Sequence, residues 1–165
     1  MASTQKTAMR RVVSVWLPRF ATDRMANRPG AGRGDPLAPP PRAAPKAIPA
    51  ATVTQARGAW RLAAVNAAAA RMGLTPGLSL ADARAQVPAL DTIPADPAAD
   101  ARALTRLARW AGRYTPWTAV DASAPEDAGI PGAGLWLDVT GCAHLFGGED
   151  ALLADLSRRL DAAGY

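Results

Sequence analysis

The sequence predicts an α+β fold, in which two strands and two helices form one pair of layers and a smaller lobe is inserted between them. Residues 12–17 (VVSVWL) are rich in β-branched residues, and residues 134–140 (GLWLDVT) alternate in the manner of a strand. Residues 97–113 and 149–163 repeat apolar positions with a helical period. These four segments carry the prediction of the fold class.

The C-terminal end of the first predicted strand has a physical reason. The strand predicted over residues 12–17 stops at Pro18, and residues 19–27 predict a short helix. Residues 51–54 and 60–65 predict two further short strands in the inserted lobe.

Two short helices are predicted in the same lobe. The Ala-rich residues 66–72 favour a helix that Gly73 ends as a C-cap. Ser79 is the predicted N-cap of a second helix over residues 80–86, which stops before Pro88.

The two longest helices separate apolar from charged residues. In residues 97–113 the inward positions are Ala101, Leu104, Leu107, Ala108 and Ala111, while Arg102, Arg106, Arg109 and Arg113 form a basic stripe. In residues 149–163 the inward positions are predicted to be Leu152, Leu153, Leu156 and Leu160. The five tryptophans are expected to anchor the core, and they are Trp16, Trp60, Trp110, Trp117 and Trp136.

Three segments predict no regular element. Residues 1–10 are polar and expected to be disordered. Residues 29–49 hold seven Pro and three Gly, which indicates a linker or an inserted loop. Residues 125–134 predict another loop. The chain ends at Tyr165, directly after Gly164, and is expected to be cut at the entry to a further strand.

Charge is distributed unevenly along the chain, whose net charge is +5. Residues 1–90 hold 13 Lys and Arg against 3 Asp, whereas residues 91–165 hold 6 Arg against 11 Asp and Glu. A basic half indicates a polyanionic or acidic partner, although a GC-rich coding bias also favours Arg and Ala. The single Cys142 excludes an internal disulfide and fits a reducing cytoplasm. No apolar stretch approaches the ~20 residues of a membrane span, and no signal peptide is recognised.

Three segments resemble the Y-family (translesion) DNA polymerases in order and spacing: residues 12–25 (VVSVWLPRFATDRM), residues 58–90 and residues 134–149 (GLWLDVTGCAHLFGGE). The segments WLPRFATDR, LAAVNAAAA and LDVTGCAHLFGGE are similar in sequence to those of ImuB-type proteins. These proteins are inactive relatives within this DinB/UmuC-like superfamily. The resemblance implies a truncated, ferredoxin-like half of a palm at residues 11–28 and 92–165. It also implies a fingers-like lobe at residues 50–91.

Active members of that family hold two metal ions with carboxylates, because polymerase chemistry uses divalent cations at both reacting oxygens. At the matching positions this sequence has Trp16, Pro18, Ala133 and Gly134, none of which can hold a metal. The resemblance therefore implies no catalytic residue and no resident metal.

The family's triphosphate contacts are replaced as well. A Tyr and an Arg of the fingers correspond here to Ala67 and Ala70, which cannot bind phosphate charge. Candidate DNA contacts in the same lobe are Arg57, Trp60, Arg61 and Arg71; the alternative is that Trp60 packs and the arginines are solvated.

The sequence contains further carboxylates and a Cys–His pair outside these matched positions. Asp138 is expected to be a capping or edge carboxylate. Asp121, Glu126 and Asp127 lie in or near the loop before the third motif, and the pair Glu126–Asp127 could be argued to replace the lost carboxylates. The Gly- and Pro-rich residues 129–134 place that pair several residues too early and on flexible backbone. Cys142 and His144 are too few for a zinc site.

The resemblance implies a non-catalytic adaptor in DNA repair and in damage-induced (SOS) mutagenesis, located in the cytoplasm and on the nucleoid after damage. Its implied partners are DNA, bound weakly and without sequence preference, a sliding clamp, an error-prone replicative-class polymerase and an ImuA-type protein. Two alternatives stay open: an active error-prone polymerase that uses Mg²⁺ through atypical ligands, and a protein-interaction module without a nucleic-acid role.

Overall fold

The computed structural model describes residues 10–27, 48–121 and 133–165. The predictions for the N-terminal residues, for most of the Pro-rich segment and for residues 125–132 lie outside these ranges. The elements follow the order β1 (Val12–Leu17), α1 (Phe20–Ala26), β2 (Ala50–Ala56), β3 (Ala59–Val65), α2 (Ala67–Arg71), α3 (Leu80–Gln86), β4 (Asp91–Pro94), α4 (Pro97–Ala111), β5 (Thr118–Asp121), β6 (Ala133–Asp138), a 3₁₀ turn (Ala143–Phe146) and α5 (Glu149–Ala162).

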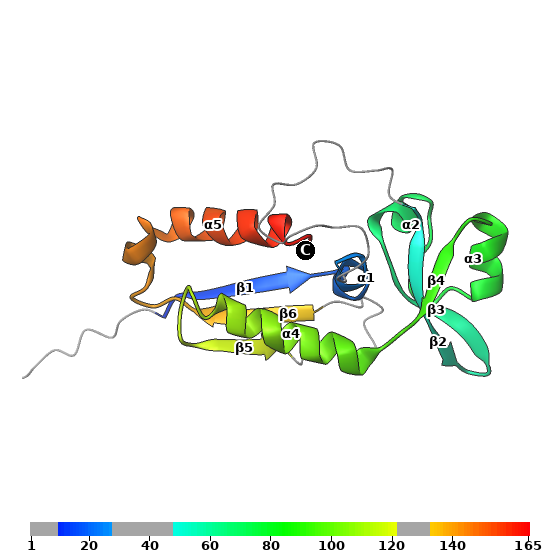
Figure 1. Ribbon diagram of the computed structural model, residues 1–165, viewed down its shortest axis with the longest axis horizontal. Helices are drawn as coiled ribbons and strands as arrows, with labels where there is room; N and C mark the ends of the chain where they lie inside the picture. Colours follow the sequence, from blue (N-terminus) through cyan, green and yellow to red (C-terminus); the bar gives the residue numbers. More distant parts are fainter. Residues whose placement is uncertain (1–9, 28–47, 122–132) are drawn as a thin grey trace, which may run out of the picture.

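The strands form two separate three-stranded sheets (Figure 1). The first sheet has the order β1-β6-β5, with β6 antiparallel to both neighbours. The second sheet has the order β3-β2-β4, in which β2 and β3 form a hairpin and β4 runs parallel to β2. The first sheet joins strands that are far apart in the sequence, because β1 at residues 12–17 pairs with β6 at residues 133–138.

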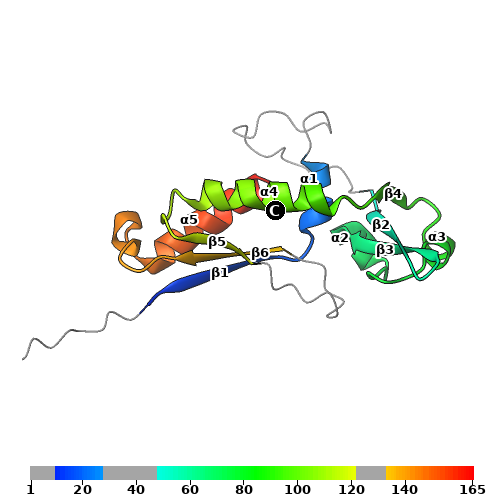
Figure 2. The ribbon, with the colours of Figure 1, turned by 90° about the horizontal axis from the view of Figure 1, so that it is seen from below.

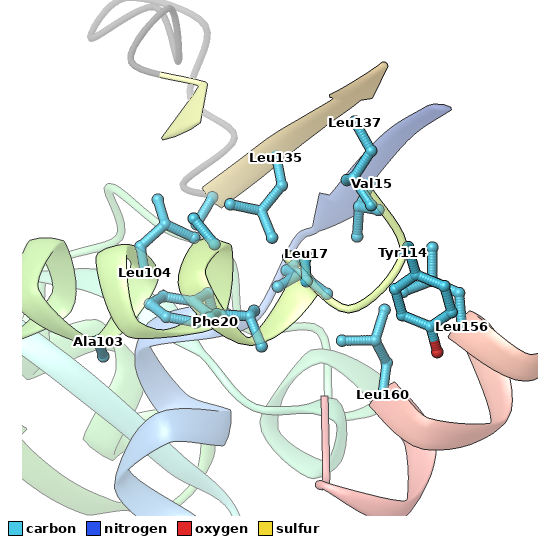
Figure 3. Close-up of a cluster of buried hydrophobic side chains, with 14 of the residues drawn as sticks. Val15, Leu17, Phe20, Ala103, Leu104, Tyr114, Leu135, Leu137, Leu156 and Leu160 are labelled. Atoms are coloured by element: carbon cyan, nitrogen blue, oxygen red, sulfur yellow. The ribbon is translucent and has the colours of Figure 1, made fainter. Parts of the chain in front are cut away.

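Helices cover one face of the first sheet. Figure 2 shows α1, α4 and α5 on the same side of strands β1, β5 and β6. Their apolar side chains meet the inward residues of the strands in one core (Figure 3), where Leu137 is 0% and Leu152 is 1% exposed. The remaining face of this sheet is covered by none of the described helices, and we call it the open face.

A second core fills the lobe made by β2, β3, β4, α2 and α3. Leu62 and Leu74 are 2% and 1% exposed at its centre. The lobe contacts the rest of the chain through α1, which packs against β2 and β3. The second core draws on residues 51–90, whereas the main core draws on residues 15–20 and 103–160. Strand β4 pairs with β2 and so extends the sheet of the lobe to residue 94, past the predicted boundary near residue 91. Whether the two cores are independent domains stays a prediction.

Most elements agree with the sequence analysis, including the helix over residues 80–86 and its N-cap Ser79, whose hydroxyl accepts from Asp82 N–H. The prediction of two strands in the main layer was wrong, because β5 is a third strand, and β4 was also missed. Both strands have four residues. Such short segments carry too little alternation to be recognised, and their pairing with β6 and β2 decides their conformation.

The expectation that the tryptophans anchor the core was wrong for four of the five. Trp16, Trp60, Trp117 and Trp136 are 44%, 48%, 73% and 43% exposed. Only Trp110 packs against the core. Leu153 was also expected inward, yet it is 44% exposed and lines a groove between β1 and α5. Ala101 of α4 was expected inward as well but is exposed, because the buried face of the helix is turned towards Ala103. The main core is instead filled by Leu, Val and Ala together with Phe20 and Tyr114.

Candidate functional site

The candidate site lies on the open face, at the end of the sheet that is nearer the lobe. Val15 and Leu17 are buried on β1, so the alternation of the strand places Trp16 on the opposite, open face. Trp16 is paired with Gly134 of β6, and Gly134 is paired with Asp121 of β5. Directly paired residues share a face of a sheet. The three residues therefore form one row across the open face.

The space above Gly134 is occupied by its neighbour. A Cβ atom added to Gly134 would lie 2.9 Å from Asp121 Cβ and 3.2 Å from Asp121 Oδ2. It would also lie 3.4 Å from the Val15 carbonyl oxygen. Any side chain at residue 134 therefore requires Asp121 to shift.

The residues at this place do not fit a pair of magnesium ions. Mg²⁺ requires several hard oxygen ligands that converge on one point. Trp16 and Gly134 supply no side-chain oxygen, Ala133 is buried opposite Leu17, and Pro18 lies in the turn after β1. Asp121 adds one carboxylate, and the described residues contain no group of three His, Cys, Asp or Glu able to hold a metal. The absence of catalytic ligands in the whole protein stays a prediction.

Asp138 lies at the far end of β6, paired with Val12. Hydrogen bonds from the Thr140 side chain and backbone N–H, the latter 3.0 Å long, hold the pKa of Asp138 below its ordinary value, and Arg10 contributes less. This geometry agrees with the predicted capping role. Three residues of strand lie between Asp138 and Gly134, a separation of about 13 Å along an extended strand, so the two do not belong to one site.

The lobe positions that the sequence analysis matched to triphosphate contacts lie on α2. Ala67 is half-buried and Ala70 is exposed. The side chain of Asn66 caps this helix by accepting from Ala69 N–H at 2.9 Å. Arg71 is exposed at the end of α2 and is the cationic residue of this short helix.

The four candidate DNA contacts differ in their surroundings. Arg57 and Gly58, with φ values of 53° and 75°, form the tight turn of the β2–β3 hairpin, which leaves Arg57 exposed at its tip. Trp60 follows on β3 and is half exposed. Arg61 points to the other face of β3 and donates from Nη1 to the Gly77 carbonyl at 2.9 Å, so it also has a structural role.

Cys142 and His144 lie at the 3₁₀ turn that follows β6. The Cys142 thiol lies 3.8 Å from the Thr140 carbonyl oxygen, and His144 is exposed on the 3₁₀ turn. Both observations agree with the view that these residues form part of a turn.

Sequence analysis missed the aromatic character of the open face. Trp136 lies on the same face as Trp16, and the exposed Trp117 directly precedes β5. The signal was present in the alternation of GLWLDVT, because inward Leu135 and Leu137 place Trp136 outward. The assumption that tryptophan is buried overrode that pattern.

Comparisons with known proteins agree with this arrangement. The model of the impB/mucB/samB family matches residues 44–164. Protein ImuB from two strains of Caulobacter vibrioides, NA1000 / CB15N and ATCC 19089 / CIP 103742 / CB 15, is 49% identical over 89 residues, or 54% of this chain. The matched part spans only 18% of the length of those relatives.

Solved structures agree on the fold. A binary complex of Dbh DNA polymerase has a TM-score of 0.62 at 16% identity, over 90% of this chain and 36% of that one. DinB from Sulfolobus solfataricus has a TM-score of 0.61 at 15% identity, and the match covers 94% of this chain and 38% of that one. At this identity the likeness concerns the fold alone. The predicted α+β, partial Y-family polymerase fold is confirmed, as is the resemblance to ImuB.

Proposed function

Because the chain belongs to the impB/mucB/samB family, we propose that it is the palm- and fingers-like part of a non-catalytic, Y-family-like adaptor of the ImuB type. Its role is in translesion synthesis after DNA damage. Residues 11–28 and 92–165 form the palm-like part of this adaptor, and residues 50–91 form the fingers-like lobe.

One observation carries the proposal. The two positions that correspond to carboxylate ligands on neighbouring strands are Trp16 and Gly134, and these residues are paired across β1 and β6. An active polymerase would need oxygen ligands there to bind its metals. An exposed indole beside a bare backbone supplies surface for contact with another molecule, but no metal ligand.

The alternative of an active polymerase has one observation in its favour. Asp121 places a carboxylate beside Gly134, at the very position where a longer acidic side chain would otherwise project. A polymerase with atypical ligands would depend on this carboxylate and on Mg²⁺. The far carboxylate Asp138 would contribute nothing to that chemistry.

Primer extension by the protein in its full natural length tests the proposal. We expect no nucleotide incorporation with Mg²⁺ or Mn²⁺. Incorporation that is abolished by Asp121→Asn and retained in the matched control Asp138→Asn would overturn the proposal in favour of the alternative. The catalytic activity of a contaminating polymerase would respond to neither substitution.

The proposed contacts with DNA are weak and involve phosphates. Arg57, Trp60 and Arg71 are exposed on the lobe, and Arg61 is partly accessible. Such contacts weaken as salt rises. A sliding clamp, an error-prone replicative-class polymerase and an ImuA-type protein are proposed partners of the whole adaptor, which acts in the cytoplasm and on the nucleoid. Co-purification of these proteins with the full-length adaptor after DNA damage would test that part.

The exposed tryptophans favour a second candidate, a protein-interaction module that does not bind nucleic acid. Trp16, Trp117 and Trp136 expose aromatic surface around one sheet face, and such residues are enriched at protein interfaces. A DNA-binding titration at low salt separates the two candidates. Absence of binding even at low salt would favour the interaction module.

A further inference from the structure

Helix α4 carries a row of arginines that the proposed function does not use. Arg102, Arg106 and Arg109 are all exposed, and Arg113 follows two residues after the helix ends. At 3.6 residues per turn the first three fall within about 60° of one another, over about 10 Å of helix length. They project from the side of α4 that is opposite its buried residues Leu104, Leu107, Ala108 and Ala111.

The location of this row differs from that of the open face. Helix α4 packs on the covered face of the first sheet, together with α1 and α5 (Figure 2). Trp16 and Gly134 lie on the other face of the same sheet. A molecule bound along the outer side of α4 is therefore separated from the open face by the helix and the sheet.

Within the described residues, no acidic side chain pairs with the four arginines. The two acidic residues at the start of α4 are engaged elsewhere: Asp96 accepts from Ala99 N–H as the N-cap, and Asp100 pairs with Arg24 of α1. Neighbours at i, i+3 and i, i+4 are like charges, which repel and destabilise the helix. The row is therefore retained at a cost to the stability of α4.

Helix α5 provides a comparison within the same structure. Arg158 and Arg159 are also exposed on a helix, but both pair with Asp155, and Arg159 Nε lies 2.7 Å from its carboxylate. Residues 91–165 are acidic overall, yet several of their carboxylates are paired, including Glu149 with Arg11 at 3.3 Å. Among the described residues of this half, the unpaired arginines thus lie on α4 and directly after it.

The chemistry of the row fits a phosphate backbone better than a protein. The exposed residue between the arginines on α4 is Thr105, and the exposed Ala101 precedes them. Trp110, beside Arg109, is half-buried and packs against the core, so no fully exposed large apolar side chain lies at the centre of the row. Protein interfaces are usually built around such a centre. Duplex DNA carries one charge per about 1.7 Å of axis, and guanidinium groups bind phosphate in a bidentate manner. Arg113 is held by stacking 4.6 Å over the Trp110 ring, which preorganises one end of the row.

We propose that α4 is a second nucleic-acid-binding surface, in which Arg102, Arg106, Arg109 and Arg113 contact the sugar–phosphate backbone without reading sequence. This surface is separate from the open face and from the lobe arginines. The inference does not depend on whether the protein is catalytically active.

The test compares two charge-matched variants by fluorescence anisotropy with a labelled 20-base-pair duplex and a single strand of mixed sequence. Arg106→Gln/Arg109→Gln should weaken binding by about tenfold at low salt and reduce the slope of log K against log[salt] by roughly 2. Arg158→Gln/Arg159→Gln changes the net charge equally and should bind like the wild type. Thermal melting should show that the first variant is folded, because removal of like charges does not destabilise α4.

The inference would be overturned if Arg106→Gln/Arg109→Gln bound the DNA as tightly as the wild type. It would also be overturned if that variant and the control Arg158→Gln/Arg159→Gln bound the DNA equally. Poly-glutamate serves as a probe for an acidic protein partner. If poly-glutamate binding depends on Arg106 and Arg109 while DNA binding does not, the row is a protein-docking site and the inference is wrong. If DNA binding is lost in Arg57→Gln/Arg71→Gln and retained in Arg106→Gln/Arg109→Gln, the DNA is bound by the lobe and the inference is wrong. Primer extension reports separately on the proposed function.

Discussion

The Tyr114 hydroxyl donates a 2.8 Å hydrogen bond to the Asp155 carboxylate and so joins the turn after α4 to helix α5. The Tyr114 ring is buried between Trp110 and Phe146, with centroids 5.9 Å and 5.2 Å away. Burial and the bond to Asp155 raise the pKa of Tyr114 to about 12. Hydrogen bonds from Arg159 and then from Tyr114 lower the pKa of Asp155.

The first prediction concerns Tyr114→Phe, which retains the ring and removes the donor. We expect a loss of about 1 kcal/mol in the free energy of unfolding at neutral pH, measured by urea denaturation. The raised pKa of Tyr114 implies a stability contribution that is complete below pH 10 and is lost as the pH rises towards 12. That alkaline loss should be absent from the variant. An equal alkaline loss in both proteins would contradict the assignment.

At acid pH the stability contribution of Asp155 changes with pH in the opposite direction to that of Tyr114. Because the pKa of Asp155 is lowered in the folded state, its contribution is present above the ordinary pKa of Asp and is lost as the pH falls through the folded pKa. The difference in stability between wild type and Tyr114→Phe should therefore shrink on acidification. A difference that is constant from neutral to acid pH would show that the two groups are not coupled.

A second prediction tests the crowding between Gly134 and Asp121. Gly134→Ala places a Cβ 2.9 Å from Asp121 Cβ, so we expect a loss of about 1–3 kcal/mol in the free energy of unfolding. Asp121→Gly removes the obstructing atoms. In a double-mutant cycle the cost of Gly134→Ala should be much smaller in the Asp121→Gly background. Additive effects would mean that the two residues do not compete for the same space.

The third prediction concerns Asn66, whose side chain connects three backbone segments. Its Oδ1 accepts from Ala69 N–H at 2.9 Å and Ala50 N–H at 3.1 Å, and its Nδ2 donates to the Ile48 carbonyl at 2.8 Å. Asn66→Ala should lower the stability of the lobe by about 1–3 kcal/mol, measured by denaturant unfolding.

Asn66→Asp is the control variant, because it retains acceptor oxygens and loses the donor to the Ile48 carbonyl, while the negative charge that it adds lies at the N-terminus of α2, where the helix dipole favours it. Its cost should lie between those of the wild type and Asn66→Ala. If Asn66→Ala costs no more than the single cap removed by Ser79→Ala, the additional bonds to residues 48 and 50 contribute nothing.

The fourth prediction tests whether the two cores are independent. Leu62→Ala and Leu137→Ala each remove a side chain that is at most 2% exposed, and each should cost about 2–5 kcal/mol. Native-state hydrogen exchange should then accelerate mainly in the lobe for Leu62→Ala and in the main sheet for Leu137→Ala. Equal acceleration throughout both variants would contradict the division into a palm-like part and a lobe.

The sequence by itself determined the elements whose cause is local. Strand β1 ends where Pro18 removes a donor, and α3 begins where Ser79 accepts from Asp82 N–H. The apolar stripe of α4 also predicted Leu104, Leu107, Ala108 and Ala111 as buried residues, although it wrongly placed Ala101 inward and missed Ala103. The resemblance of the three motifs to one family was likewise contained in the sequence, because that pattern depends only on residue identity and spacing.

Only the tertiary structure decided which residues meet. It placed Asp121 beside Gly134, left the tryptophans of the open face exposed and added β5 to the sheet. It also showed which arginines are paired, since Arg158 and Arg102 are both helix-surface arginines but only Arg158 has a carboxylate partner among the described residues. The physical reason is that pairing between strands, burial of an indole and neutralisation of a charge depend on distances between residues far apart in the chain. Local propensities do not encode those distances.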